Sequence, residues 1–204
     1  VCPCVLRSPP FCMNANPSAL PTSHQSIVEQ LDLMLRARYP LIYIVGVEEE
    51  PIETVLAETA ARSKLKQELY LWDIVRGWND NGSDKGSAIA ALGRIAKAPG
   101  EKPAIYVLRD LHPVLKYPLS APNGPVIREI KNLARELKRS RKTLLFTSYS
   151  LDVPPEFIEE MTVIDFPLPD ADEINYLISQ LVVPEKLKLS QLSREQLIKA
   201  CQGL

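Results

Sequence analysis

A turn beginning at Gly46 carries the residues of this chain whose types and spacing lie closest to a chemical motif. Gly46 follows the apolar run Leu41 to Val45, and Glu48, Glu49 and Glu50 come soon after it. A buried strand, a glycine turn and a helix form the frame of a phosphate-binding loop, which needs the pattern G-x-x-x-x-G-K-[ST] to hold a nucleotide and Mg²⁺. Here no Lys is placed to reach a phosphate, and no Ser or Thr is placed to hold the metal. The turn therefore predicts a nucleotide site that is closed.

The three carboxylates also have a structural explanation. Acidic side chains in a first helical turn offset the helix dipole by roughly 0.3–1 kcal/mol each, and Pro51 suits the first helical position. The same carboxylates would repel a polyphosphate, at a cost of roughly 1 kcal/mol per pair of charges at contact in bulk water. We interpret residues 46–51 as a structural turn, with a ligand-binding loop as the alternative.

Asp110 is a second candidate, because it follows the buried run Ala104 to Leu108 and Arg109. Ligands of α/β sheets bind at the carboxyl ends of the strands, where an acid can hold Mg²⁺ or a catalytic water. The structural alternative is that Asp110 caps the following turn and pairs with Arg109. His112 has no partner at metal-ligand spacing, so we interpret it as a turn histidine.

A basic run extends from Arg135 to Lys142. Because a helix C-terminus favours cations by itself, we interpret the run as a solvated helix end. Binding of nucleic acid through residues 135–142 is the alternative.

The first 22 residues are rich in Pro, Asn and Ser and have no periodicity. Cys2, Cys4 and Cys12, even together with His24, do not match the pair spacing of structural zinc sites. We expect residues 1–22 to form a disordered leader without a metal.

The composition is that of a globular domain with a small appendage: 204 residues, 46% hydrophobic, 24% charged, net charge -1. This balance gives no global attraction to nucleic acid or to an anionic membrane. No apolar run approaches the roughly 20 residues that span a bilayer.

The elements that must position the candidate residues alternate between strands and helices, which predicts parallel βαβ units. The expected strands cover 41–45, 68–75, 104–108, 143–148 and 161–166. The expected helices cover 26–38, 49–64, 87–98, 125–138, 155–160, 170–181 and a segment from residue 193. Ser26, Asp170 and Ser193 each precede a Glu or Gln by three residues, which is typical of a capping box.

These elements predict an α/β domain over 23–168 and part of a helical lid over 169–204. The lid helix would carry one apolar face, made of Ile174, Leu177, Ile178 and Leu181. We expect this face to be partly uncovered and the protein to continue beyond residue 204.

The order of the elements resembles an AAA ATPase core, a P-loop-NTPase-like five-stranded parallel sheet with flanking helices. IYIVG stands in place of the Walker A strand, AIYVLRD resembles the Walker B strand, and VIDFPLPD resembles the exit to the lid. More narrowly, LDLMLRARYPLIYIV and VLRDLHPVL are similar to the N-terminal half of one family, the AAA protein of hypothetical chloroplast reading frame forty-six. The resemblance covers residues 26–204.

The resemblance implies a second, complete AAA module downstream that would bind ATP and Mg²⁺, and it allows a homo-oligomer. The location implied is the plastid stroma or the cyanobacterial cytoplasm. Thr147 and Ser148 stand near the sensor-1 position without its usual Asn, and Arg109 stands where AAA enzymes place an acid. No catalytic or metal residue and no cofactor is expected in this part of the protein.

Three hypotheses about function follow. The first is a catalytically inactive AAA-like domain, the structural and docking half of an ATP-dependent remodelling protein, implied to act in regulation of photosynthesis or inorganic-carbon use. The second is a divergent NTPase that binds nucleotide through Asp110, Thr147 and the lid. The third is a nucleic-acid-binding module that uses residues 135–142.

Overall fold

The computed structural model describes residues 22–63, 66–181 and 190–201. The predicted leader lies outside these residues except for Thr22, which begins helix α1 (Thr22–Arg36). Because α1 already includes Ser26, the predicted cap at Ser26 is wrong. No described helix is long and apolar enough to cross a membrane.

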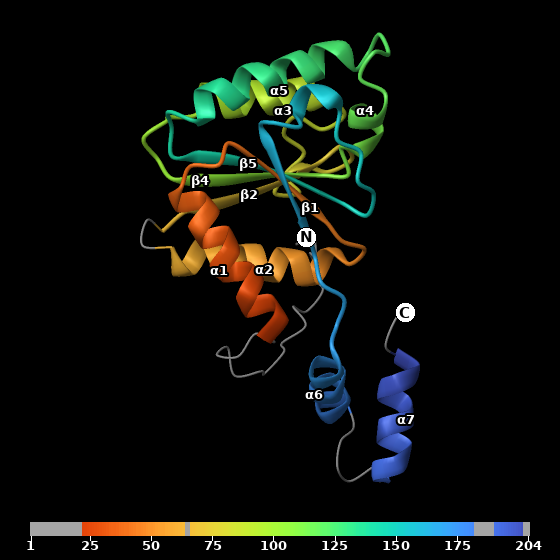
Figure 1. Cartoon of the computed structure of the whole chain (residues 1–204). Coiled ribbons are helices and arrows are strands. Elements are labelled where there is room, and N and C mark those ends of the chain that lie inside the picture. The colour runs from red at the N-terminus through yellow and green to blue at the C-terminus, as the bar shows by residue number, and fades with distance from the viewer. Residues whose placement is uncertain (1–21, 64–65, 182–189, 202–204) are drawn as a thin grey trace, which may run out of the picture.

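One six-stranded sheet forms the centre of the α/β domain, as Figure 1 shows. The strands are β1 (Leu41–Val45), β2 (Glu68–Asp73), β3 (Gly77–Trp78), β4 (Ala104–Arg109), β5 (Lys142–Ser148) and β6 (Met161–Asp165), in the order β3-β2-β4-β5-β1-β6. Five strands run parallel, and only the two-residue β3 is antiparallel to its neighbour β2. The predicted five-stranded parallel sheet is confirmed, although β2 ends at Asp73 and not at Val75.

Helices cover both faces of the sheet (Figure 1). On one side lie α1 and α2 (Glu49–Arg62), and on the other lie α3 (Ala88–Lys97), α4 (His112–Lys116) and α5 (Gly124–Leu137). Ile42 and Ile44 of β1 pack in the cluster with α1 and α2, whereas Leu41 and Tyr43 pack in the cluster with α3 and α5. This double burial explains why β1 is apolar at every position, as expected for a central parallel strand.

The lid segment consists of α6 (Ala171–Leu181) and α7 (Gln191–Cys201), after the short η1 (Pro155–Phe157) and β6. The capping box predicted for α6 is confirmed. The N–H of Glu173 donates to Asp170 Oδ1 at 2.8 Å, and the N–H of Asp170 donates to Glu173 Oε2 at 3.4 Å. Ser193 does not cap α7, because the helix begins two residues earlier and Ser190 Oγ accepts the N–H of Ser193.

The apolar residues that the described part of the lid exposes lie on α7, whereas the sequence predicted them on α6. Ile174 and Ile178 of α6 are buried, each 7% exposed, so these two residues of the predicted face are covered. Leu192 and Leu197 of α7 are exposed instead. The side chains of Leu177 and Leu181 lie outside the described residues.

Candidate functional site

The carboxyl ends of β1, β4 and β5 meet at one edge of the sheet, which we call the carboxyl edge. Val45 is in register with Ser148, and Arg109 is in register with Thr147. This register brings the turn after β1, Asp110 after β4, and the end of β5 together, although they are far apart in the sequence.

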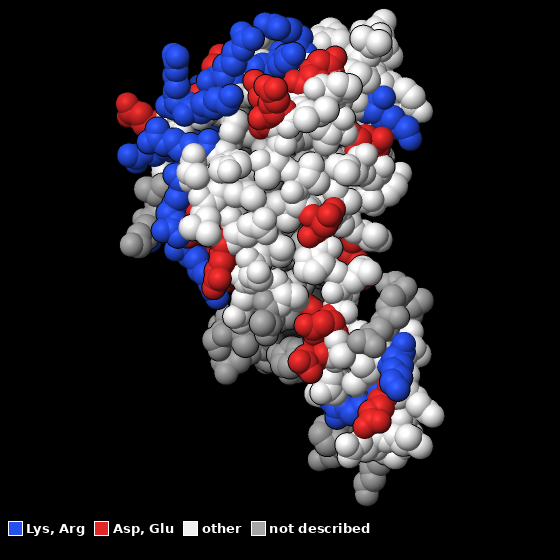
Figure 2. Space-filling view, viewed as in Figure 1, with Lys and Arg blue, Asp and Glu red and all other residues white. Residues whose placement is uncertain are grey.

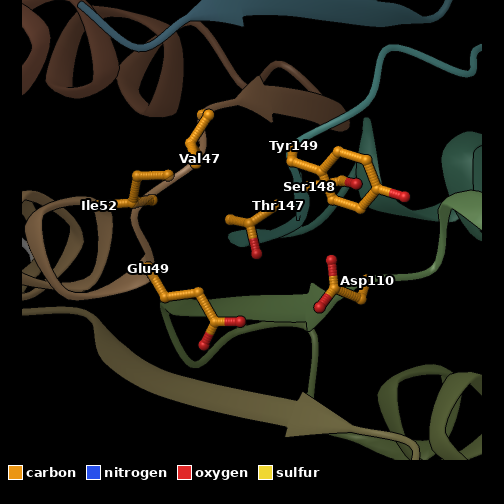
Figure 3. Close-up of a pocket in the computed structure, with 8 residues that line it drawn as sticks. Val47, Glu49, Ile52, Asp110, Thr147, Ser148 and Tyr149 are labelled. Atoms are coloured by element: carbon orange, nitrogen blue, oxygen red, sulfur yellow. The ribbon is translucent and has the colours of Figure 1, made fainter. Parts of the chain in front are cut away.

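A cavity of about 80 Å³ lies at this edge (Figure 3). Its lining includes five of the seven predicted site residues: Gly46, Glu49, Asp110, Thr147 and Ser148. Glu48 and Glu50 do not line it. Sequence reasoning missed Val47, Ile52 and Tyr149, which also line the cavity. Val47 follows Gly46 and Tyr149 follows Ser148. Their position next to these predicted residues is the signal by which the sequence could have indicated them.

The connection from β1 to α2 contains only residues 46–48. Glu48 is the N-cap residue without a side-chain cap bond, and Glu49 and Glu50 lie in the first turn, all three exposed. Pro51 was predicted to be the first residue of the helix. It is the third, because α2 begins at Glu49. A Cβ on Gly46 would lie 2.8 Å from Ile52 Cδ1 and 2.9 Å from Phe166 Cβ. On the side of Gly46 where a Cβ would lie, the turn therefore packs tightly against Ile52 of α2 and against Phe166.

Asp110 has a left-handed backbone, with φ at 52°. Its N–H donates to the carbonyl of Thr147 at 2.9 Å, and its carboxylate is exposed. The predicted pair between Asp110 and Arg109 is not formed. Adjacent strand-end residues point in different directions, and Arg109 turns toward α2 and β2.

Arg109 joins three segments through carboxylates. Its guanidinium lies 2.9 Å from Glu53 in α2, 2.8 Å from Asp73 in β2 and 3.5 Å from Asp80 in the following loop. Burial by itself would lower the pKa of Arg109, but the charges of Glu53 and Asp73 outweigh it and the pKa is raised. The cation beside the site is thus neutralised within the protein and is not free to bind a phosphate.

His112, Ser148 and Asp110 resemble a hydrolase triad in composition but not in geometry. Ser148 Oγ lies 2.9 Å from His112 Nδ1, and Asp110 Oδ1 lies 3.7 Å from the same nitrogen. A triad needs the nucleophile and the acid on opposite ring nitrogens. His112 begins α4 and stacks edge-on with Tyr149, so we interpret it as a residue that fixes the end of β5.

The charge of the cavity is unsuited to a nucleotide. No residue that lines it is basic, and two are acidic. Among the described residues, no group of three or more His, Cys, Asp or Glu could hold a metal ion. The lining of this cavity therefore offers no cation to offset the charge of a polyphosphate.

The fold is that of an AAA-type domain. One similar solved structure is a chain of the E. coli MS115-1 HORMA:CdnC:Trip13 complex, with a TM-score of 0.60, 16% identity, and coverage of 86% of this chain and 72% of that chain. Another is the FIGL-1 AAA domain in complex with ADP, with a TM-score of 0.58 and 12% identity. The match covers 93% of this chain and 67% of that chain. At these identities the similarity shows the fold alone.

Sequence comparison gives the family. The model of the SpoVK-like AAA ATPase N-terminal domain matches residues 27–166, and the chain belongs to this family. Similar relatives are proteins named "Uncharacterized AAA domain-containing protein ycf46". The one from Guillardia theta is 34% identical over 88% of this chain, and the one from Trieres chinensis is 32% identical over 86%. The chain spans 35% of the length of each. The predicted resemblance is confirmed.

Proposed function

We propose that this domain is a catalytically inactive AAA-like domain, the structural and docking half of a longer ATP-dependent remodelling protein. The observation that carries the proposal is the three-residue connection from Gly46 to Glu48, which is packed against Ile52 and followed by further carboxylates. A phosphate-binding loop surrounds its anion with backbone N–H groups, and three residues are too few to do so. Phosphoryl transfer also needs a metal ligand and a cation at the phosphates, and Arg109 is already paired.

Calorimetric titration with millimolar ATP and Mg²⁺ tests the proposal. We expect no saturable heat from the wild-type chain, and saturation at one site per chain would overturn the idea. A variant with Glu48→Gln, Glu49→Gln and Glu50→Gln serves as a second probe. If this variant binds ATP, charge is the main obstacle, but hydrolysis should still be absent because Arg109 replaces the catalytic acid.

A divergent NTPase is the second candidate, because Asp110 and Thr147 line the same cavity. Its size argues against a nucleotide, since small-molecule pockets usually enclose roughly 300–1,000 Å³ and this one encloses about 80 Å³. If nucleotide does bind, Asp110→Asn should weaken it by changing the only acid on the β4 side of the cavity. Binding that is unaffected by this change would exclude the Asp110 site.

In the longer protein we propose that a downstream AAA module binds ATP and Mg²⁺. The resemblance to the plastid reading-frame family supports a role in photosynthesis or inorganic-carbon use, in a plastid or a cyanobacterial cell. A deletion strain should then grow more slowly than the parent at low inorganic carbon. Equal growth at low and high inorganic carbon would contradict this role.

A further inference from the structure

Positive charge gathers at the edge opposite the cavity, where the parallel strands begin. In Figure 2, Lys and Arg side chains follow this amino edge and the end of α5. Besides Lys102, which follows Glu101 before β4, six exposed cations there make no ion pair within the described residues. We call them the basic edge: Arg38, Lys66, Lys97, Arg135, Arg139 and Arg141.

The basic edge follows adjacent strands without a gap. Lys66 precedes β2, Lys97 ends α3 before β4, Arg139 and Arg141 precede β5, and Arg38 precedes β1. These four strands are neighbours in the order β2-β4-β5-β1. With strands about 4.8 Å apart, the row extends for about 14 Å. A nucleic acid strand in a duplex carries a phosphate about every 3.4 Å, so the row can contact about four phosphates.

Two of the six cations occupy left-handed backbone positions, which side chains rarely adopt. Arg38 has φ at 59° and Lys66 has φ at 43°. Arg38 is the C′ residue of a Schellman motif, because its N–H donates to Leu35 and the N–H of Tyr39 donates to Met34. Gly is the usual residue at this position. Cations at two positions where Gly would be less strained indicate a role of the charge outside the fold.

Other cations in the same region have structural roles, which separates them from the basic edge. Arg36 and Arg62 form i,i+4 pairs with Asp32 and Glu58. Lys142 is buried and donates to the carbonyls of Ile95 and Ala98, at the end of α3. The helix dipole also favours Lys97 and Arg135 in the last turns of α3 and α5. It does not account for Arg139 and Arg141, which lie beyond the end of α5.

We propose that the basic edge binds the phosphate backbone of nucleic acid without sequence preference. Four of its six residues are Arg, whose fork matches phosphate oxygens better than an ammonium does. An anionic membrane fits less well, because the more exposed apolar residues Val47, Val75 and Tyr149 lie at the carboxyl edge. Beside the cations, Tyr39 follows Arg38 and is only 41% exposed. This activity is independent of ATP and goes beyond the proposed docking role.

Fluorescence anisotropy with a short labelled RNA strand and the full 204-residue chain tests the proposal. Between about 50 and 200 mM salt, the logarithm of the binding constant should fall against the logarithm of salt with a slope of about −3, as expected for about four phosphate contacts. No binding at the lowest salt, or binding that salt does not change, would overturn the proposal.

Two double variants with equal loss of charge make the test specific. Arg38→Gly with Lys66→Gly should weaken binding by at least about tenfold, while the melting temperature stays equal or rises because Gly suits both positions. Arg36→Gln with Arg62→Gln, which changes the paired cations, should weaken it by less than about threefold. If both double variants lose RNA binding equally, the net charge of the protein alone determines binding. This result would overturn the assignment to the basic edge.

Competition experiments distinguish nucleic acid from other polyanions as the ligand of the basic edge. Unlabelled RNA should displace the probe, whereas polyglutamate of matched charge should displace it poorly. Polyglutamate that competes equally, or binding to phosphatidylserine vesicles in preference to RNA, would overturn the nucleic-acid assignment in favour of an acidic protein or a membrane.

Discussion

At the scale of single residues, Arg109 links separate segments of the domain. It stands directly before Asp110 at the carboxyl edge, yet its guanidinium joins α2, β2 and the loop after β3. The role of this ion cluster is to hold the edge together.

We predict that Arg109→Met lowers the free energy of unfolding by about 2 kcal/mol, because three carboxylates remain close together without their cation. Arg76→Met is the matched control, since Arg76 is exposed and lies 3.8 Å from Asp80 alone. The control should change stability by less than about 0.5 kcal/mol. Urea denaturation measures both, and equal effects would contradict the role of the cluster.

Tyr70 gives a prediction for alkaline pH. Its hydroxyl donates to the Glu68 carboxylate, and this bond, followed by burial, raises the pKa of Tyr70 to about 12. The unfolded value is near 10, so the folded state binds the proton more tightly. The stabilisation is complete below pH 10 and is lost as the pH rises toward 12.

Denaturation midpoints at about pH 8, 10 and 11 check this expectation. The wild type should lose more stability above pH 10 than Tyr70→Phe does. Tyr117→Phe, which changes an exposed tyrosine, should follow the wild type. If the curve of Tyr70→Phe runs parallel to that of the wild type, the Glu68 contact does not stabilise the fold.

At the scale of elements, the short connection between β1 and α2 decides what the carboxyl edge can do. A glycine is required at position 46 because Ile52 and Phe166 lie too close to leave room for a Cβ. The backbone angle of Gly46 does not require a glycine. The same contacts that close the site fix the start of α2 against the end of β1.

We predict that Gly46→Ala costs about 1–3 kcal/mol of stability through overpacking. Ile52→Val removes Cδ1, the nearest atom, so the double variant should be less destabilised than the sum of the two changes. Gly93→Ala in α3 is the control, because its Cβ would meet nothing within 4 Å, and it should stabilise the helix by up to about 1 kcal/mol. Additive effects at Gly46 and Ile52 would show that the close approach does not matter.

At the scale of the whole molecule, Glu173 joins the lid segment to the α/β domain. It caps α6 and accepts a hydrogen bond from Ser23 Oγ at 3.0 Å, and it lies 3.3 Å from His24 Nε2 in α1. Glu173 is buried although it is a carboxylate. Helices α1 and α6 are therefore joined through one side chain.

We predict that Glu173→Ala lowers hydrogen-exchange protection in α6 by about fivefold, which corresponds to about 1 kcal/mol of lost capping and contact. Protection in β1, β4 and β5 should stay the same. Asp172→Ala, a change at an exposed neighbour, should leave α6 nearly unchanged. A uniform loss across the sheet would show that Glu173 stabilises the whole domain and not the attachment of α6.

The sequence by itself determined most of the elements and their type, although it did not predict β3 or α4. Apolar runs such as LIYIV in β1 and AIYVL in β4 mark the central strands, and the Asp170–Glu173 box sets the start of α6 by local hydrogen bonds. These signals lie within a few residues, so they can be read without the fold. They also predicted five of the residues around the cavity.

Only the tertiary structure decided which distant groups meet. Arg109 could pair with its neighbour Asp110 by sequence, but packing directs it to Glu53 and Asp73, which belong to other elements. The basic edge likewise arises because parallel strands bring the ends of four helices to one side of the sheet. A sequence read along the chain cannot give this order, since the pairing of strands depends on how both faces of the sheet are buried together.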